Sequence, residues 1–103
     1  MNICAAKELE TANAELNAQW KLTLEHMRQL DKEDDEPWAA GPSYSQALRN
    51  AQRTWLAYRE AQCTLDSYNT RGGSMRPMLY SMCAADLTRE RTRQLAEIVS
   101  GEQ

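Results

Sequence analysis

Residues 43–67, SYSQALRNAQRTWLAYREAQCTLDS, decide the fold because they predict one long amphipathic helix. Ser43 followed by Gln46 matches the capping box, in which a side-chain oxygen accepts a hydrogen bond from a free backbone N–H group. Apolar and aromatic residues then recur at alternating spacings of four and three, which is typical of one helical face. This stripe consists of Tyr44, Leu48, Ala51, Trp55, Tyr58, Gln62 and Leu65.

A second strip on this helix consists of Leu56, Arg59 and Cys63. Two adjacent strips predict neighbours on two sides, so we expect this helix to be the middle one of three. The Arg59 guanidinium needs acceptors, because an unpaired buried charge is costly. Asp66, Asp86 and the carbonyls of the following turn are available, and an Arg fork suits several acceptors. We therefore expect Arg59 to organise the turn at residues 68–76.

A helix is also predicted before this one, over residues 2–30, where no Pro or Gly interrupts the sequence. Asn2 can cap its start. Its apolar face consists of Leu9, Leu16, Trp20, Leu24 and Met27. The acidic segment DKEDDEPWAAGP, residues 31–42, then predicts an exposed loop, because like charges repel and proline breaks helices. Trp38 in this loop either folds back over the core or contacts a partner.

A third helix is predicted over residues 76–99, after a turn that contains Gly72 and Gly73. Pro77 suits its first turn, with Ser74 or Arg76 as the cap, and Gly101 ends it. Its apolar face consists of Leu79, Met82, Cys83, Leu87, Leu95 and Ile98. Three helices with short connections predict an all-α fold, an antiparallel three-helix bundle that forms a single domain over residues 1–103.

Composition narrows the class of protein further. The chain has 103 residues, a 42% apolar fraction and a net charge of −3, which argues against a nucleic-acid partner. No apolar run approaches the roughly 20 residues of a membrane helix, so no membrane span is expected. Charge is uneven: residues 1–42 hold 4 basic and 9 acidic side chains, whereas residues 43–103 hold 8 and 6. These runs of like charge form either a solvated face or an electric field that steers a charged partner.

Three cysteines, Cys4, Cys63 and Cys83, leave an odd number for pairing. Cys63 lies ten residues before Gly73 and Cys83 ten residues after it, so an antiparallel hairpin brings the two to one level. This symmetry favours a Cys63–Cys83 disulfide, which would add about 3 kcal/mol of stability. Three reduced thiols, or a disulfide from Cys4 to either partner, remain the alternatives.

The residues indicate no catalytic centre. His26 lacks an orienting partner, and the cysteines lack the paired spacing of a structural zinc site. The Gly-Gly-Ser turn is no phosphate-binding loop, and a small bundle offers little room for a substrate pocket. We therefore expect neither an enzyme nor a bound metal or cofactor.

Two motifs carry a resemblance. Residues 52–63, QRTWLAYREAQC, resemble the motif Q-R-x-W-x-x-Y/F-R-D/E-A-x-C of the LprI-like lysozyme inhibitor family, with Trp55, Tyr58 and Arg59 at its defined positions. Matches also occur in the first helix, at Met1-Asn2-x-Cys4-Ala5, Leu16-Asn17 and Trp20. The turn and the third helix match the signature G-G-S-x-x-P…C…T-x-x-R, at Gly72-Gly73-Ser74, Pro77, Cys83, Thr88 and Arg91.

The resemblance implies an exported all-helical bacterial protein, periplasmic or secreted, with its signal peptide removed or a lipid anchor attached. It also implies that the partner is lysozyme and that binding protects peptidoglycan. An oxidising compartment favours disulfides over free thiols. Family members often carry an additional upstream cysteine, so Cys4 is either unpaired or paired with a cysteine upstream.

Lysozyme cleaves with two carboxylic groups in a cleft, and Arg binds a carboxylate through two hydrogen bonds. The loop Arg71, Gly72, Gly73, Ser74, Met75 and Arg76 is therefore the predicted binding site. The acidic residues 31–36 would attract a strongly basic lysozyme at long range. Alternatively, the Gly-Gly-Ser loop only closes the helix hairpin. The rival function is a non-inhibitory envelope module that binds another protein or peptidoglycan through Trp38 and Tyr44.

Overall fold

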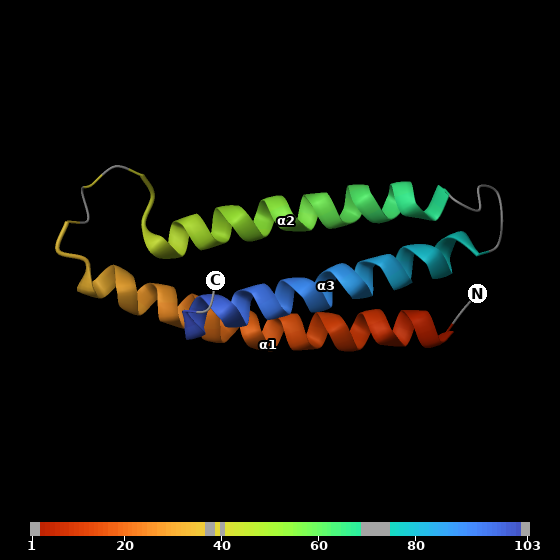
Figure 1. Cartoon of the computed structure of the whole chain (residues 1–103), viewed down its shortest axis with the longest axis horizontal. Helices are drawn as coiled ribbons and strands as arrows, with labels where there is room; N and C mark the ends of the chain where they lie inside the picture. The colour runs from red at the N-terminus through yellow and green to blue at the C-terminus, as the bar shows by residue number, and fades with distance from the viewer. Residues whose placement is uncertain (1–2, 37–38, 40, 69–74, 102–103) are drawn as a thin grey trace.

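Three long helices make up the computed structural model, which describes residues 3–36, 39, 41–68 and 75–101 (Figure 1). They are α1 (Ile3–Glu33), α2 (Tyr44–Ser67) and α3 (Arg76–Ser100). Successive helices run in opposite directions, so α1 and α3 are parallel to each other (Figure 1). The bundle is elongated, with extents of 56 × 23 × 18 Å. The predicted all-α three-helix architecture is confirmed.

Local sequence signals account for most of the helix ends. Ser43 is the N-cap of α2, and its hydroxyl accepts a hydrogen bond from the Gln46 backbone N–H at 3.2 Å, as predicted. The Gln46 side chain, however, donates to Asn50. Gly101 ends α3 in the left-handed conformation, with φ of 80°. The N-cap of α3 is Met75, which makes no side-chain cap bond, so the prediction of Ser74 or Arg76 is wrong.

The first helix is longer than predicted, because it continues to Glu33 instead of ending at residue 30. No helix-breaking residue occurs before Pro37, and Lys32 in the last turn is favourable at the negative end of the helix dipole. The first three residues of the predicted loop are therefore helical. This extension places Asp31 on α1, facing the start of α2.

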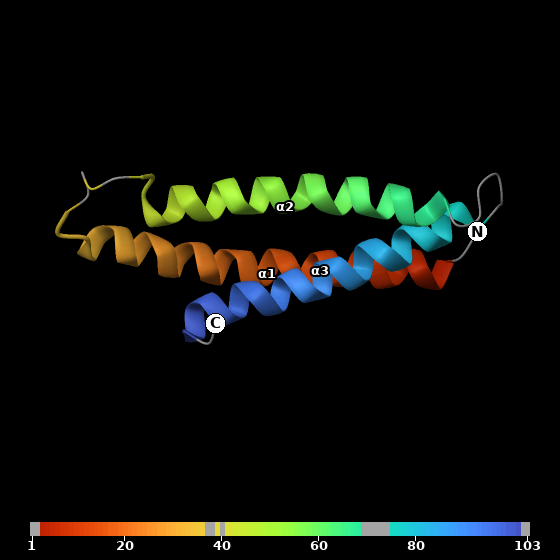
Figure 2. The same ribbon diagram turned by 45° about the horizontal axis from the view of Figure 1, so that its top comes forward.

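The packing order differs from the prediction that α2 is the middle helix. α1 and α3 make the most extensive contact, and α2 lies along this pair (Figure 2). Small side chains allow the close approach of α1 and α3, since Ala12, Ala84 and Ala85 are all buried. The core joins all three helices and consists of Leu16, Leu48 and Leu95, with Trp20, Leu24, Met27, Trp55 and Ile98 packed against it.

The buried face of α2 is also rotated from the predicted stripe. Leu48 and Trp55 turn inward as expected, but Tyr44, Tyr58 and Leu65 are 47%, 53% and 61% exposed. The strip that faces the other helices consists of Ser45, Leu48, Gln52, Trp55, Arg59, Cys63 and Ser67. Leu56 and, on α3, Met82 were predicted to be buried, but they are also exposed. None of the described helices is long and apolar enough to cross a membrane.

A buried polar contact fixes α1 against α3. The hydroxyl of Thr23, which is fully buried, donates a hydrogen bond of 3.0 Å to the carbonyl of Leu95. The Gln19 side chain donates to the same hydroxyl at 3.1 Å. Because buried polar groups are costly when unpaired, this contact favours one register between the two helices.

Candidate functional site

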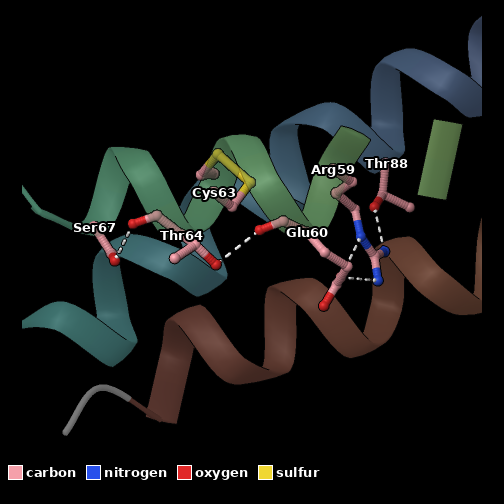
Figure 3. Close-up of a disulfide and its surroundings, with 7 residues drawn as sticks. Arg59, Glu60, Cys63, Thr64, Ser67 and Thr88 are labelled. Carbon is pink, nitrogen blue, oxygen red and sulfur yellow. Dashed lines mark hydrogen bonds and ion pairs between the residues drawn. A yellow bond between two sulfur atoms is a disulfide. The ribbon is translucent and has the colours of Figure 1, made fainter. Parts of the chain in front are cut away.

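A disulfide joins α2 to α3 near their connection, as Figure 3 shows. The Cα atoms of Cys63 and Cys83 are 5.4 Å apart, which is within the usual range for a disulfide. The prediction of this pair from the symmetry of the hairpin is confirmed. Cys4, in the first turn of α1, is exposed and is not part of a disulfide in this structure.

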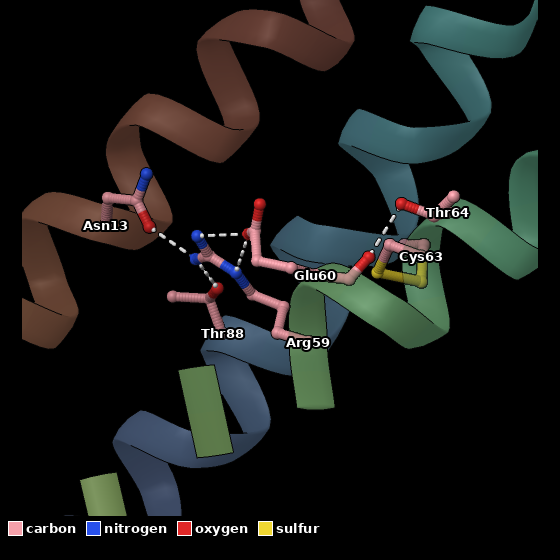
Figure 4. A network of polar contacts seen from close by, with 7 residues as sticks. Asn13, Arg59, Glu60, Cys63, Thr64 and Thr88 are labelled. Carbon is pink, nitrogen blue, oxygen red and sulfur yellow. Dashed lines mark hydrogen bonds and ion pairs between the residues drawn. A yellow bond between two sulfur atoms is a disulfide. The ribbon is translucent and has the colours of Figure 1, made fainter. Parts of the chain in front are cut away.

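Arg59 is the centre of a polar network that links all three helices (Figure 4). Its Nη1 donates hydrogen bonds of 3.0 Å to Asn13 Oδ1 on α1 and to Thr88 Oγ1 on α3. Its Nε and Nη2 donate to Glu60 Oε2 at 3.2 and 3.0 Å. The guanidinium also lies over the Trp55 ring, 5.5 Å from its centroid.

The described bonds of Arg59 do not include the predicted acceptors Asp66 and Asp86, and its role in organising the turn at residues 68–76 stays a prediction. The bonds described for its guanidinium go to Asn13, Thr88 and Glu60, and Asp86 pairs with Arg89 instead. The Arg59 side chain is only 13% exposed, so its charge needs these partners. Sequence reasoning identified a buried arginine correctly but missed Asn13, because nothing local to Asn13 signals a contact with another helix.

Glu60 and Tyr80 extend this network along the α2–α3 boundary. A hydrogen bond from the Tyr80 hydroxyl is the main cause that lowers the pKa of Glu60, and the Arg59 guanidinium lowers it further. The pKa of Tyr80 is raised, first by burial and then by its bond to the Glu60 carboxylate. Glu60 therefore stays ionised and balances the charge of Arg59.

A further contact between α2 and α3 lies beyond Arg59 and Thr88, on the side away from the disulfide. Arg91 Nε donates to Gln52 Oε1 at 2.8 Å, and its Nη1 donates to Gln94 Oε1 at 3.1 Å. Partial burial lowers the pKa of Arg91. Gln52–Arg91, Arg59–Thr88 and Cys63–Cys83 form three successive links, which we call the α2–α3 ladder.

The ladder gives most of the sequence motif a structural role. In the motif on α2, Gln52 contacts Arg91, Arg59 contacts Thr88, and Cys63 forms the disulfide with Cys83. All three partners lie on α3 and also match the family. Trp55 packs on the core below Arg59, and Pro77 occupies the first turn of α3. Tyr58, by contrast, points away from the other two helices and is 53% exposed. Gln52, Trp55, Arg59 and Cys63 therefore hold the helices together.

The predicted binding loop comes between α2 and α3 in the sequence. Arg71, Gly72, Gly73 and Ser74 are outside the described residues, whereas Arg76 is half-buried at the start of α3. Its guanidinium carbon is 4.8 Å from the centroid of the Tyr68 ring, so Arg76 stacks on the end of α2. The neighbouring Met75 and Tyr68 are 48% and 46% exposed, which leaves an accessible aromatic and basic surface here.

The opposite end of the bundle is acidic. The Asp31 carboxylate accepts hydrogen bonds from the Tyr44 N–H at 2.7 Å, the Ser45 N–H at 3.2 Å and the Ser45 hydroxyl at 2.6 Å. Chiefly through the Ser45 hydroxyl, these bonds lower the pKa of Asp31. A carboxylate from α1 thus binds free N–H groups at the start of α2. Sequence reasoning placed Asp31 in a solvated loop and missed this contact.

An open hollow of about 820 Å³ lies beside this contact. It is lined by the acidic residues 33–36 together with Tyr44 and Ala47 of α2. Trp38, predicted either to cover the core or to contact a partner, is outside the described residues. Among the residues that the structure describes, no group of three or more His, Cys, Asp or Glu side chains is arranged to hold a metal ion.

The chain is similar to a known protein family. A family model described as "Lysozyme inhibitor LprI" matches residues 1–95. An uncharacterised protein of Rhizobium meliloti (strain 1021) is 44% identical over 103 residues, which are all of this chain and 74% of the relative. No solved structure matches.

Proposed function

Because the chain belongs to the family of the lysozyme inhibitor LprI, we propose that it binds lysozyme outside the cytoplasm and inhibits it, which protects peptidoglycan. The family match is the observation that carries this proposal. The Cys63–Cys83 disulfide supports the location, since disulfides persist in oxidising compartments such as the periplasm.

The proposed contact surface is the loop of Arg71, Gly72, Gly73, Ser74 and Arg76. Its two arginines can each bind a carboxylate through paired hydrogen bonds, and lysozyme has two carboxylic groups in its cleft. The loop joins two helices that the ladder already holds together, so little conformational entropy is lost in the supporting helices on binding. Tyr68 and Met75 add an exposed apolar rim.

The acidic end has a separate role in this proposal. The hollow beside Asp31 carries a local negative charge from residues 33–36. Lysozymes that are strongly basic would be drawn toward this charge, which raises the association rate more than the final affinity. High salt should therefore slow the association of the complex.

A lysis assay tests the proposal directly. We expect the protein in micromolar excess to slow the clearing of a bacterial suspension by at least one type of lysozyme. The double variant Arg71→Ala with Arg76→Ala should weaken inhibition by at least about tenfold, since each lost charged contact is worth a tenfold factor or more.

The matched control is Arg89→Ala with Arg93→Ala, which removes the same charge from exposed positions on α3. This control should retain potency and helicity. Failure to inhibit several lysozyme types would contradict the proposed function. Equal losses in both double variants would contradict the loop as the contact site.

A second candidate is a non-inhibitory envelope module, favoured by one observation. Tyr44 is 47% exposed and lines the acidic hollow, so an aromatic and polar surface is available for another protein or for peptidoglycan fragments. Binding of purified peptidoglycan fragments without any effect on lysozyme, weakened by Tyr44→Ala, would support this function over inhibition.

A further inference from the structure

The arginines on α2 and α3 differ in the partners that balance their charge. One group forms ion pairs with carboxylates and consists of Arg59, Arg89 and Arg93. The acceptors of two others are neutral amides. Arg53 Nη2 donates to Asn50 Oδ1 at 2.8 Å, and Arg91 donates to Gln52 at 2.8 Å and to Gln94 at 3.1 Å. An amide oxygen accepts a hydrogen bond but leaves the positive charge of the guanidinium unbalanced.

Three such arginines are grouped around Gln52. Arg49 is three residues before Gln52, and Arg53 is four residues after Arg49, so α2 presents both arginines as surface neighbours. Arg91 reaches Gln52 from α3. Arg49 makes no hydrogen bond or ion pair with any residue that the structure describes. We call Arg49, Arg53 and Arg91 the arginine cluster.

Two acidic residues come close to the arginine cluster, but both are engaged elsewhere. Glu90, next to Arg91 in the sequence, forms its ion pair with Arg93. Asp31 attracts Arg49 at longer range, but its carboxylate already accepts three hydrogen bonds from the start of α2. Within the described ranges, no carboxylate forms an ion pair with the arginine cluster.

Such an arrangement costs stability unless an anion completes it. Like charges four residues apart on a helix repel each other, as Arg49 and Arg53 do here. Arg49 and Arg91 are also half-buried, and removing a charge from water is unfavourable when no opposite charge replaces the water. Burial accordingly lowers the pKa of Arg91. A bound anion would relieve both the repulsion and the lost hydration.

The number and type of the charges indicate the class of anion. The planar guanidinium group binds the oxygens of phosphate through paired hydrogen bonds. A carboxylate would bring a single negative charge to three positive ones, whereas a phosphate monoester brings about 1.5 to 2. Leu56 lies three residues after Arg53 and is 45% exposed, so an apolar contact is available beside the phosphate.

From this arrangement we infer that the arginine cluster between α2 and α3 is a binding site for the phosphate group of a ligand. Arg49, Arg53 and Arg91 bind the phosphate oxygens, and Gln52 holds the Arg91 guanidinium toward α2. Leu56 contacts the group that carries the phosphate. The inference does not depend on the proposed function, because the cluster uses no residue of the loop at 71–76.

Titration calorimetry with inorganic pyrophosphate at physiological salt tests the site. We expect one site per chain, with a Kd on the order of 100 µM. Arg49→Gln with Arg53→Gln should raise the Kd at least about tenfold, because two charge-assisted contacts are lost. Neither arginine bonds to another helix in the described structure, so this variant should keep the helicity of the parent, measured by circular dichroism.

The matched control is Arg89→Gln with Arg93→Gln, which removes the same charge from α3 outside the arginine cluster. Its Kd should stay within about twofold of the parent value. Absence of binding up to about 5 mM pyrophosphate would overturn the inference, and so would an equal loss in both double variants. Tighter binding of citrate than of pyrophosphate would overturn the assignment to phosphate.

Vesicles then distinguish the two sources of a phosphate group. Co-sedimentation with phosphatidylcholine vesicles that contain phosphatidic acid, but not with phosphatidylcholine alone, would assign the phosphate to a lipid headgroup. Arg49→Gln with Arg53→Gln should weaken that co-sedimentation, and Leu56→Ser should weaken it as well. Binding of pyrophosphate without co-sedimentation would assign the site to a small soluble phosphate compound.

Discussion

The two ends of the bundle are held together by different chemistry. At one end, the α2–α3 ladder combines a disulfide with the buried network of Arg59. At the other end, α3 stops short of the α1–α2 connection, and the carboxylate of Asp31 supports the start of α2 (Figure 1). A covalent bond is unaffected by mild acid, whereas a carboxylate contact fails when it is protonated. One end is therefore rigid under most conditions, and the other responds to pH.

The largest expected effect comes from removing the disulfide. Cys63→Ala with Cys83→Ala should lower the free energy of unfolding by about 3 kcal/mol, because a loop of this length restricts the unfolded chain. Urea titration of the variant and the parent measures the difference. Cys4→Ala, which removes an exposed thiol, should change stability by less than about 0.5 kcal/mol. Equal stability of the double variant and the parent would show that the ladder does not depend on its covalent link.

The next effect concerns the polar part of the same end. Arg59→Met keeps much of the side-chain volume but leaves the Asn13 and Thr88 oxygens without their donor. Because hydrogen bonds to a charged group are worth more than neutral ones, we expect a loss of about 2 kcal/mol. Chemical denaturation measures it, with Arg93→Met on the exposed face of α3 as the control that stays near zero. Similar losses of stability in both variants would show that the Arg59 network contributes nothing specific to the fold.

The smallest effect lies at the Asp31 end and depends on pH. Asp31→Asn should lower the melting temperature at pH 7, because the amide accepts the three bonds less well than the carboxylate. Folding lowers the pKa of Asp31, so its contribution is complete above about pH 4 and is lost as the pH falls through the lowered value.

Thermal scans of Asp31→Asn and the parent from pH 7 down to about pH 2 check the sign. The two melting temperatures should converge in acid. Asp35→Asn, at an exposed position of the same acidic segment, should show no such difference at any pH. A gap between Asp31→Asn and the parent that persists in acid would mean that the charge of Asp31 is not the cause.

The sequence predicts much of the fold because its strongest signals are local. The Ser43 cap, the Gly101 terminus and the proline-rich break each act within a few residues. The disulfide was predictable as well, since two cysteines at equal distances from a hairpin turn must lie at the same level. Such signals do not depend on which other helix lies nearby.

The errors arose where two distant segments decide the outcome. Trp55 and Tyr58 look alike in the sequence, yet one packs on the core and the other is exposed, because α2 carries an apolar repeat on both faces. Asp31 and Asn13 gain their partners only when α1 lies against α2. In the candidate site, the structure describes Arg76 at the start of α3. Residues 71–74 lie outside the described residues, so their role in binding stays a prediction.

The disulfide also sets how this protein would respond to mechanical force. α1 and α3 are parallel, so pulling on the two chain ends shears the bundle along its length (Figure 1). The segment between Cys63 and Cys83, a separation of 20 residues, cannot lengthen while the bond is intact. At about 3.4 Å per residue, the fully stretched chain would be shorter by about 65 Å than its reduced form. Under tension, α1 therefore detaches, whereas the disulfide keeps α2 and α3 joined near Cys63 and Cys83.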